Sequence, residues 1–303
     1  MNTRSLLLLL LSWVAVSSAQ AQQIDRKLTE QLQPLLRSFQ GRAGIYVENL
    51  STGKIVQINA DTVFPTASMV KIPIMVGIFQ KIAHDSLTYH QALVYRDSLL
   101  YEGEDILGSF KDSEQIQLSK VMMLMLTMSD NTASLWLQSL AGGGQSINNW
   151  LGEHGYTYTR VNSRTPGRQA NRELYGWGQT TPREMATLMK SIYQGKVINK
   201  TASERMYRNL TRNFWDTEGA VMVPANVRTA TKNGMVDASR SEVILVNAPH
   251  GDYVYCLQTK NNTDQRWERN NEAWVLMRQV AALLWKYYEP KGQQGVGSLA
   301  EQY

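Results

Sequence analysis

The sequence predicts an α/β protein in which an antiparallel five-stranded sheet is flanked by helices and interrupted by an inserted all-α domain. Two short alternating runs near the start are typical of strands. A long block then follows with mainly helical spacing, and three more strand-like runs come after it. Because strands lie on both sides of the helical block, we expect one sheet built from both ends of the chain.

The first 21 residues have the features of a secretory signal peptide. Arg4 supplies a positive charge, an apolar run begins at Leu6, and Ala19-Gln20-Ala21 offers a small-x-small cleavage pattern. The apolar run is too short to span a bilayer. We therefore expect an exported protein, periplasmic or secreted, with no membrane span and a mature chain that begins at Gln22.

The sheet domain is expected to be discontinuous, with residues 22–62 and 212–290. It opens with an amphipathic helix from Ile24 to Phe39. The strands are expected at Gly44–Glu48, Lys54–Asn59, Val227–Thr231, Glu242–Val246 and Tyr253–Thr259, and a last helix at Glu272–Tyr288. Residues 291–303 are rich in glycine and glutamine and are expected to form a flexible tail.

The all-α domain is expected to span residues 63–211. Its helices are expected at Met69–Ala83, Leu118–Met128, Thr132–Leu140, Ser146–His154 and Pro182–Tyr193. A cleft between this domain and the sheet is the natural place for a functional site.

Composition excludes several classes of function. The formal charge of +5 is spread along the chain without a Lys/Arg run, so nucleic acid is not an expected partner. Cys256 is the single cysteine, which rules out an intrachain disulfide, and its alternating surroundings favour a small buried residue. The four histidines are dispersed without metal-ligand spacing, so no metal or other cofactor is expected. The protein is expected to act as a monomer.

A first chemical motif places Ser68 at a helix start and Lys71 one turn later. Residues at i and i+3 lie on one helix face, so the two side chains can meet. A serine hydroxyl needs a base beside it, and a partly desolvated lysine with a lowered pKa can be that base. The helix N-terminus adds positive potential where an oxyanion would form.

Two further motifs accompany this pair. Ser129-Asp130-Asn131 lies on a turn between two apolar helices and can present a hydroxyl and an amide to one ligand. Lys232-Asn233-Gly234 ends a predicted strand, where glycine lets a substrate backbone approach the strand edge. Ser-x-x-Lys alone is a weak signal, but the three motifs in this order form a specific set.

With these motifs, the sequence resembles a class A β-lactamase, a member of the penicillin-interacting active-site-serine superfamily. The resemblance extends roughly from residue 24 to residue 288. It includes Phe64-Pro65-Thr66-Ala67-Ser68, Thr127-Met128-Ser129-Asp130-Asn131-Thr132-Ala133 and Thr180-Thr181-Pro182-Arg183-Glu184-Met185-Ala186. It implies the β-lactamase/DD-peptidase fold, a hydrolase active on β-lactams, and a role in antibiotic resistance.

The resemblance also implies catalytic roles by position. Ser68 would open the β-lactam ring and become acylated, and Lys71 would accept or relay its proton. Ser129 would pass a proton to the leaving nitrogen. Lys232 would hold the Ser129 hydroxyl and the substrate carboxylate.

Substrate binding is implied in the same way. Asn131 would bind the side-chain amide of the substrate, and the N–H groups of Ser68 and Met235 would form the oxyanion hole. Asn233 and Gly234 complete the strand motif. The family usually has threonine or serine where this chain has Asn233, and an amide can still donate to a carboxylate.

A second departure concerns the deacylation base. Class A β-lactamases carry a Glu-x-x-x-Asn pattern on the loop before Thr-Thr-Pro, but a gap-free comparison places Ser163-Arg164-Thr165-Pro166-Gly167 there. The nearest glutamate, Glu173, lies about eight residues later and is either a catalytic base on a rebuilt loop or an exposed residue paired with an arginine. A missing general base slows turnover by orders of magnitude.

Three functions remain open from the sequence. The first is a β-lactamase that works through a Ser68 acyl-enzyme. The second is a D-alanyl-D-alanine peptidase-like or slowly deacylating penicillin-binding serine hydrolase with the same acylation machinery. The third is a non-catalytic exported protein that binds a β-lactam or a peptidoglycan-like wall peptide, and the joint presence of Ser68, Lys71, Ser129, Asn131 and Lys232 disfavours it.

Overall fold

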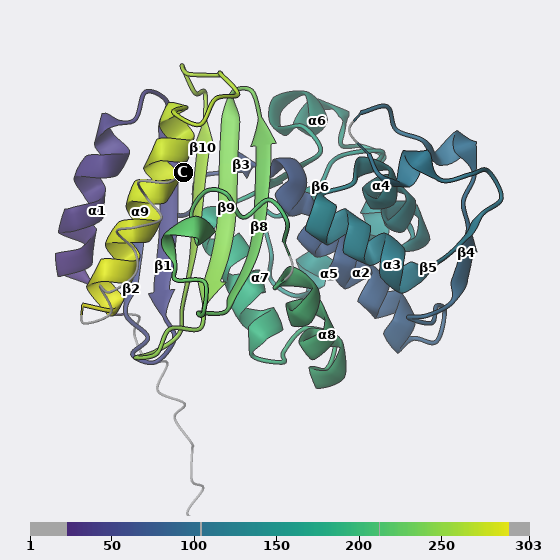
Figure 1. The fold of residues 1–303 in the computed structure, drawn as a ribbon, viewed down its shortest axis with the longest axis horizontal. Coiled ribbons are helices and arrows are strands. Elements are labelled where there is room, and N and C mark those ends of the chain that lie inside the picture. The colour runs from purple at the N-terminus through teal and green to yellow at the C-terminus, as the bar shows by residue number, and fades with distance from the viewer. Residues whose placement is uncertain (1–22, 104, 212, 291–303) are drawn as a thin grey trace, which may run out of the picture.

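Five antiparallel strands form the central sheet, in the order β2-β1-β10-β9-β8 (Figure 1). The strands are β1 (Arg42–Asn49), β2 (Ile55–Ile58), β8 (Thr229–Val236), β9 (Ser239–Val246) and β10 (Tyr253–Lys260). The first two come from the start of the chain and the other three from its end, which confirms the predicted sheet. The computed structural model describes residues 23–290 except 104 and 212, so the predicted signal peptide and tail lie outside the described residues.

One strand boundary differs from the sequence expectation in a way that matters for function. The strand was expected to span Val227–Thr231 with Lys232, Asn233 and Gly234 at its end, whereas β8 continues to Val236 and contains all three. They pair with Val243, Glu242 and Ser241 of β9. The apolar pattern used to predict the strand stops at the polar side chains of Lys232 and Asn233. The backbone pairing between β8 and β9 continues beyond these residues to Val236.

Helices cover both faces of the sheet. One face is covered by α1 (Arg26–Ser38) and α9 (Glu272–Tyr288), which lie side by side (Figure 1). The other face packs against α7 (Pro182–Tyr193), which contacts β1, β9 and β10. Each face has its own hydrophobic core, and burial of that apolar surface is the main favourable contribution to folding.

The helical part of the molecule lies beyond β8 (Figure 1). Its helices are α2 (Lys71–Ala83), α3 (Leu118–Met123), α4 (Asn131–Leu140), α5 (Gly143–Glu153), α6 (Gln169–Tyr175) and α8 (Lys200–Leu210). Neither α6 nor α8 was predicted from the sequence. Residues 169–175 contain no buried side chain, so α6 lacks the apolar periodicity that identifies a helix in a sequence.

Short elements complete the fold. A three-stranded sheet joins β3 (Phe64–Pro65), β7 (Gly178–Thr180) and β6 (Arg160–Val161), and a two-stranded one joins β4 (Ala92–Val94) and β5 (Gln115–Gln117). The 3-10 helices are η1 (Ala67–Val70), η2 (Asp97–Leu99), η3 (Leu107–Ser109) and η5 (Ala220–Met222), and η4 (Leu124–Met128) is π-helical. Because β3 pairs with β7, the chain before Ser68 is tied to the chain after α6.

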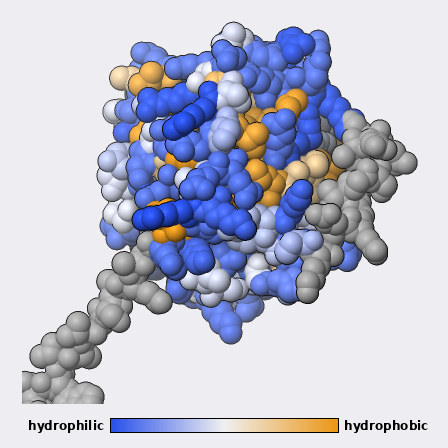
Figure 2. Space-filling model, turned by 90° about the vertical axis from the view of Figure 1, so that its left-hand side faces the viewer, coloured by the Kyte–Doolittle hydropathy of each residue, from blue (hydrophilic) through white to orange (hydrophobic). Residues whose placement is uncertain are grey.

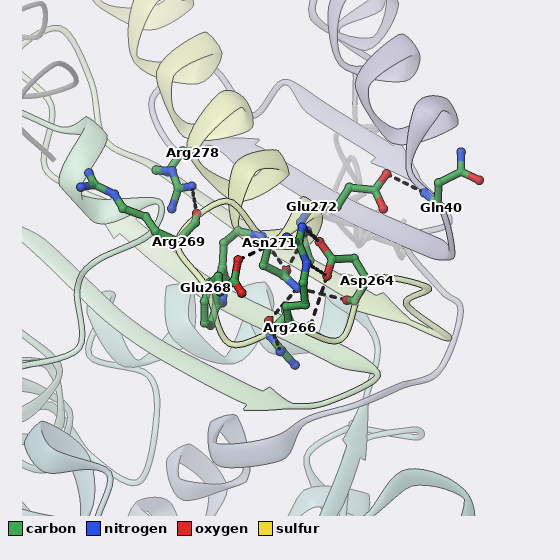
Figure 3. A network of polar contacts seen from close by, with 11 residues as sticks. Gln40, Asp264, Arg266, Glu268, Arg269, Asn271, Glu272 and Arg278 are labelled. Carbon is green, nitrogen blue, oxygen red and sulfur yellow. Dashed lines mark hydrogen bonds and ion pairs between the residues drawn. The ribbon is translucent and has the colours of Figure 1, made fainter.

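A polar network fixes the start of α9 (Figure 3). Asn271 accepts hydrogen bonds from the backbone N–H groups of Ala273 and Trp274, as an N-cap does. Asp264 accepts from the Glu272 backbone N–H at 3.0 Å and pairs with Arg266 at 2.9 Å. The network anchors the loop between β10 and α9 and therefore orients the helix on the sheet.

The face on the α1 side is largely hydrophilic, and its hydrophobic atoms gather mainly in a band right of the centre of the view (Figure 2). Among the helices of residues 23–290 as described, none is both long and apolar enough to cross a membrane.

Candidate active site

Ser68 lies in η1, which leads directly into α2. The preceding residue, Ala67, has a φ of +42°, a left-handed conformation that is costly for alanine. A hydrogen bond of 2.9 Å from Thr66 N to Gly178 O holds this turn to β7. Ser68 is half-buried, and the strained turn places it in the wall of a cavity.

Lys71 is fully buried, and its amine lies between Ser68 and the turn that carries Ser129 and Asn131. Its Nζ is 3.0 Å from Ser68 Oγ, 3.1 Å from Ser129 Oγ, 2.5 Å from the Ser129 carbonyl oxygen and 2.8 Å from Asn131 Oδ1. A protonated lysine has three N–H donors for these four partners. In the neutral form the nitrogen lone pair can accept a proton instead, and the hydroxyls of Ser68 and Ser129 are the two partners that carry one.

The surroundings of Lys71 favour this neutral form. Burial lowers the pKa of Lys71 well below its usual value, and the positive charge of Lys232 lowers it further. The carboxylates of Asp105 and Asp130 act in the opposite direction and do not offset the burial. Lys71 is therefore equipped to take the proton from an attacking serine hydroxyl.

The turn that carries Ser129 follows the π-helical segment η4, and such segments are frequent at functional sites. Ser129 has a φ of +60°, in the left-handed region. Asp130 is buried and accepts hydrogen bonds from Ala133 N at 2.7 Å and Leu107 N at 2.8 Å. Asp130 thus holds the turn, while the residues on either side of it contact Lys71.

Asp105 supports the same turn and was not selected from the sequence. Its carboxylate accepts hydrogen bonds from Asn131 N at 2.8 Å, and from Thr132 N and Oγ1 at 2.7 Å each. Asp105 and Asn131 are 26 residues apart in the chain, and no motif links them. Only the fold reveals Asp105 as a residue that positions Asn131.

Lys232 approaches the site from β8, the edge strand of the sheet, and is fully buried. Its Nζ donates to the backbone oxygen of Asn233 at 3.0 Å and to Asn233 Oδ1 at 3.3 Å. The implied contact with the Ser129 hydroxyl is not among its hydrogen bonds in the described part of the chain. That hydroxyl accepts from Lys71 instead. Burial lowers the pKa of Lys232 to about 8, against the opposing charges of Asp216 and Glu242.

Asn233 does not face the cavity that Ser68 lines. Its Nδ2 donates to the Trp215 carbonyl oxygen at 2.7 Å, and Trp215 Nε1 donates to the Met128 carbonyl oxygen at 2.8 Å. Asn233 therefore connects β8 to the end of η4 through the Trp215 loop. This contact occupies the amide that was expected to bind the substrate carboxylate.

The site opens into a cavity of 510 Å³. The lining residues are Pro65, Ala67, Ser68, Tyr101, Asn131, Leu174, Tyr175, Gly176, Trp177, Met235, Val236, Ala238, Ser239, Lys260 and Asn261. Asn131 and Met235, both expected to bind substrate, are among them. Tyr101 and Trp177 pack edge to face, with ring centroids 5.1 Å apart, and form an aromatic wall that no sequence motif indicates.

Glu173 is not brought into this cavity. It is exposed on α6, and its Oε1 accepts a hydrogen bond of 3.0 Å from Gln169 on the same helix. The neighbouring segment from Leu174 to Trp177 lines the cavity instead, and none of the lining residues is a carboxylate. The structure therefore assembles Ser68, Lys71, Ser129, Asn131 and Lys232 without Glu173.

Comparisons with known proteins agree on one family. The model of the beta-lactamase enzyme family matches residues 27–288. The VEB-1 β-lactamase of Pseudomonas aeruginosa is 22% identical over 300 residues, which cover 94% of this chain and 97% of the relative. An imipenem-hydrolyzing β-lactamase of Enterobacter cloacae is 23% identical over 232 residues, covering 74% and 76% of the two chains.

Solved structures agree with this result. PBP-A is 27% identical with a TM-score of 0.78, over 89% of this chain and 98% of its own. One of its structures is a leucine-to-glutamate mutant described as an acyl-enzyme complex with penicillin G. A class A β-lactamase of Mycobacterium abscessus has a TM-score of 0.76 at 20% identity, over 86% and 99% of the two chains.

Proposed function

The chain belongs to the beta-lactamase enzyme family, and on that basis we propose that Ser68 attacks the β-lactam amide and becomes acylated. The protein is a serine β-lactamase-like hydrolase with the class A fold. The observation that supports this mechanism best is the position of the buried Lys71 amine, 3.0 Å from Ser68 Oγ and 3.1 Å from Ser129 Oγ.

Acylation follows from this arrangement. Ser68 Oγ attacks the carbonyl carbon of the ring while its proton passes to the neutral Lys71 amine. When the carbon–nitrogen bond breaks, the ring nitrogen takes a proton from Ser129 Oγ, and Lys71 returns the proton it received to Ser129. Each proton that leaves one group is taken up by another, so these proton transfers need no side chain besides Ser68, Lys71 and Ser129. A positioned general base contributes about 100- to 10,000-fold to such a step.

Deacylation is the slow half of the proposed reaction. A water that attacks the ester needs a base. The cavity wall from Leu174 to Trp177 carries no carboxylate that could serve as one. The absence of a carboxylate among the described lining residues also favours the second function, a slowly deacylating penicillin-binding hydrolase. The 27% identity to PBP-A adds to that alternative.

Turnover of a chromogenic cephalosporin by the wild type and by Ser68→Ala tests the proposal, together with intact mass after penicillin G. Ser68-dependent turnover supports the β-lactamase, and a persistent Ser68 adduct without turnover supports the penicillin-binding hydrolase. If neither turnover nor an adduct is found, both enzymatic functions are refuted. Resistance of a susceptible host that expresses the protein is expected only if the acyl group is released.

Export through the signal peptide is part of the same proposal. Arg4, the apolar run and Ala19-Gln20-Ala21 support cleavage after Ala21, which would place the mature enzyme in the periplasm or outside the cell. Intact mass of the protein from the periplasmic or culture fraction gives the mature N-terminus. A product that retains Met1 and stays in the cytoplasm would contradict export.

A further inference from the structure

A lysine other than Lys71 and Lys232 lines the cavity together with Ser68. Lys260 is the last residue of β10, and both it and Tyr175 of α6 line the cavity wall. Its Nζ donates to the Val63 carbonyl oxygen at 2.7 Å and lies 5.2 Å from the ring centroid of Phe64 and 5.7 Å from that of Tyr175. The side chain is thus held in place by one carbonyl and two aromatic rings.

The charge of Lys260 has no counter-ion within the described residues. No carboxylate lies within ion-pairing distance of its Nζ, and its cross-strand neighbour is another cation, Arg42. Asp61, two residues before Val63 in the chain, is paired with Arg183 at 2.7 Å. Burial and the charge of Arg42 both lower the pKa of Lys260, with no carboxylate acting against them. A partly desolvated cation without a partner is costly, and an anionic ligand relieves that cost.

The shape of the cavity indicates which part of a ligand would reach Lys260. Asn131, assigned to the side-chain amide of the substrate, lines the cavity, whereas Ser129 and Lys232, assigned to the leaving group and the ring carboxylate, do not. The cavity therefore extends from Ser68 on the acyl side of the scissile bond. Lys260 lies in that extension, together with Tyr175 and Asn261.

From this juxtaposition we propose that Lys260 is a specificity residue that binds a carboxylate on the acyl substituent of the substrate. The inference rests on the proposed function of Ser68 and adds a substrate class to it. The carboxylate forms a charge-assisted hydrogen bond with Nζ, while Phe64 and Tyr175 keep water from one side of the ammonium group. β-Lactams and wall peptides with an acidic acyl side chain present the same chemistry.

Two penicillins that differ by one carboxylate test the proposal. Benzylpenicillin and α-carboxybenzylpenicillin share the ring system, and intact mass gives the rate constant of Ser68 acylation for each. The ratio of the two rate constants is the readout, because a general loss of acylation affects both. We expect Lys260→Gln to lower the relative rate of the carboxylated penicillin about 10- to 100-fold. The glutamine keeps a donor for Val63 O but removes the charge.

Lys260→Arg is the conservative variant and should preserve the ratio, and Lys54→Gln, at an exposed lysine, is the matched control. An unchanged ratio in Lys260→Gln would overturn the proposal. If neither penicillin labels the wild type, the function proposed for Ser68 fails separately. Calorimetric binding of both compounds to Ser68→Ala then tests the role of Lys260 alone. Equal affinities for the two compounds would refute that role. A preference for the carboxylated compound that disappears when Lys260→Gln is added to Ser68→Ala would support it.

Wall peptides form the second arm of the experiment. Two D-alanyl-D-alanine peptides, one with a free carboxylate and one with an amide on the residue before the terminal pair, compete with penicillin for Ser68. If only the free-acid peptide slows the labelling of Ser68 by penicillin, and if this effect disappears in Lys260→Gln, the proposal is supported with a wall peptide as the ligand. Equal competition by the two peptides, in both proteins, argues against recognition of this carboxylate.

Discussion

Gly234 of β8 lies directly against the turn that carries Ser68. A Cβ atom at position 234 would lie 2.7 Å from the Ser68 backbone nitrogen and 2.2 Å from the Thr66 carbonyl oxygen. Both atoms belong to the backbone of a turn already constrained by the left-handed Ala67, so neither can move without moving the nucleophile. The glycine thus sets how closely the edge of the sheet approaches the reactive serine.

Gly234→Ala should therefore displace Ser68. We expect a loss of about 1–3 kcal/mol in the free energy of unfolding, as in other overpacked sites. We also expect slower acylation by penicillin G, measured by intact mass. Gly152→Ala is the control, because its Cβ would meet only Arg160 Nη2 at 3.8 Å within α5. Equal acylation rates in Gly234→Ala and the wild type would contradict this account.

Lys71→Met should remove the proton acceptor of the acylation step. The expected loss in the acylation rate constant is about 100- to 10,000-fold, the contribution of a positioned general base. Lys54→Met, at an exposed lysine, should acylate like the wild type. Because the pKa of Lys71 is lowered, the wild-type rate should rise with pH through a value well below that of an ordinary lysine and then reach a plateau. A rate that first rises near the usual lysine pKa would speak against a neutral Lys71.

Glu173→Gln should leave the lifetime of the acyl-enzyme unchanged. The side chain is exposed and bound to Gln169, outside the residues that line the cavity. The lifetime is measured by intact mass after excess penicillin has been removed. Glu153→Gln, at an exposed position of α5, is the control. A lifetime lengthened in Glu173→Gln alone would restore this glutamate as the deacylation base.

Asn233→Thr should weaken the link between β8 and the Trp215 loop. The shorter side chain loses the amide that donates to the Trp215 carbonyl oxygen and the Oδ1 that accepts from Lys232. We expect the free energy of unfolding to fall by about 1–3 kcal/mol, the cost of leaving a buried polar group without its partner. Urea unfolding measures it, with Asn149→Thr at an exposed position of α5 as control. Stability equal to that of the wild type would show that the link contributes nothing.

Glu242→Gln should change how stability depends on pH. Burial, together with the charges of Asp216 and Glu218, raises the pKa of Glu242 from an ordinary 4.5 to about 8. Between these values the folded protein holds a proton that the unfolded chain releases, so the contribution of Glu242 to stability falls as pH rises through this window. Lys232 affects stability at higher pH, because its pKa is lowered from 10.5 to about 8. Between these two values the unfolded chain holds a proton that the folded protein has released, so the contribution of Lys232 to stability rises with pH.

Urea unfolding at several values between about pH 5 and pH 8 measures this effect. Removal of the titrating group should make the decline in the free energy of unfolding less steep in Glu242→Gln than in the wild type. Glu153→Gln, on the exposed surface of α5, should follow the wild-type curve. Parallel curves for Glu242→Gln and the wild type would mean that Glu242 titrates alike in the folded and unfolded states.

The amino-acid sequence by itself determined the elements with strong local patterns and the proximity of Ser68 and Lys71, the pair proposed to react. The structure has α7 and α9 at the predicted bounds, because their apolar periodicity is complete within the helix itself. Ser68 and Lys71 were recognisable because their spacing of three residues along one helical segment fixes their proximity before any tertiary contact forms.

Only the tertiary structure decided which other groups join that pair. Asp105, Trp215 and Lys260 reach the site through contacts between segments distant in sequence, which no local pattern encodes. The position of Glu173 was decided in the same way, because α6 directs it to solvent while the next residues line the cavity. Local periodicity thus predicts elements and motifs, whereas burial and long-range hydrogen bonds select the residues that share one site.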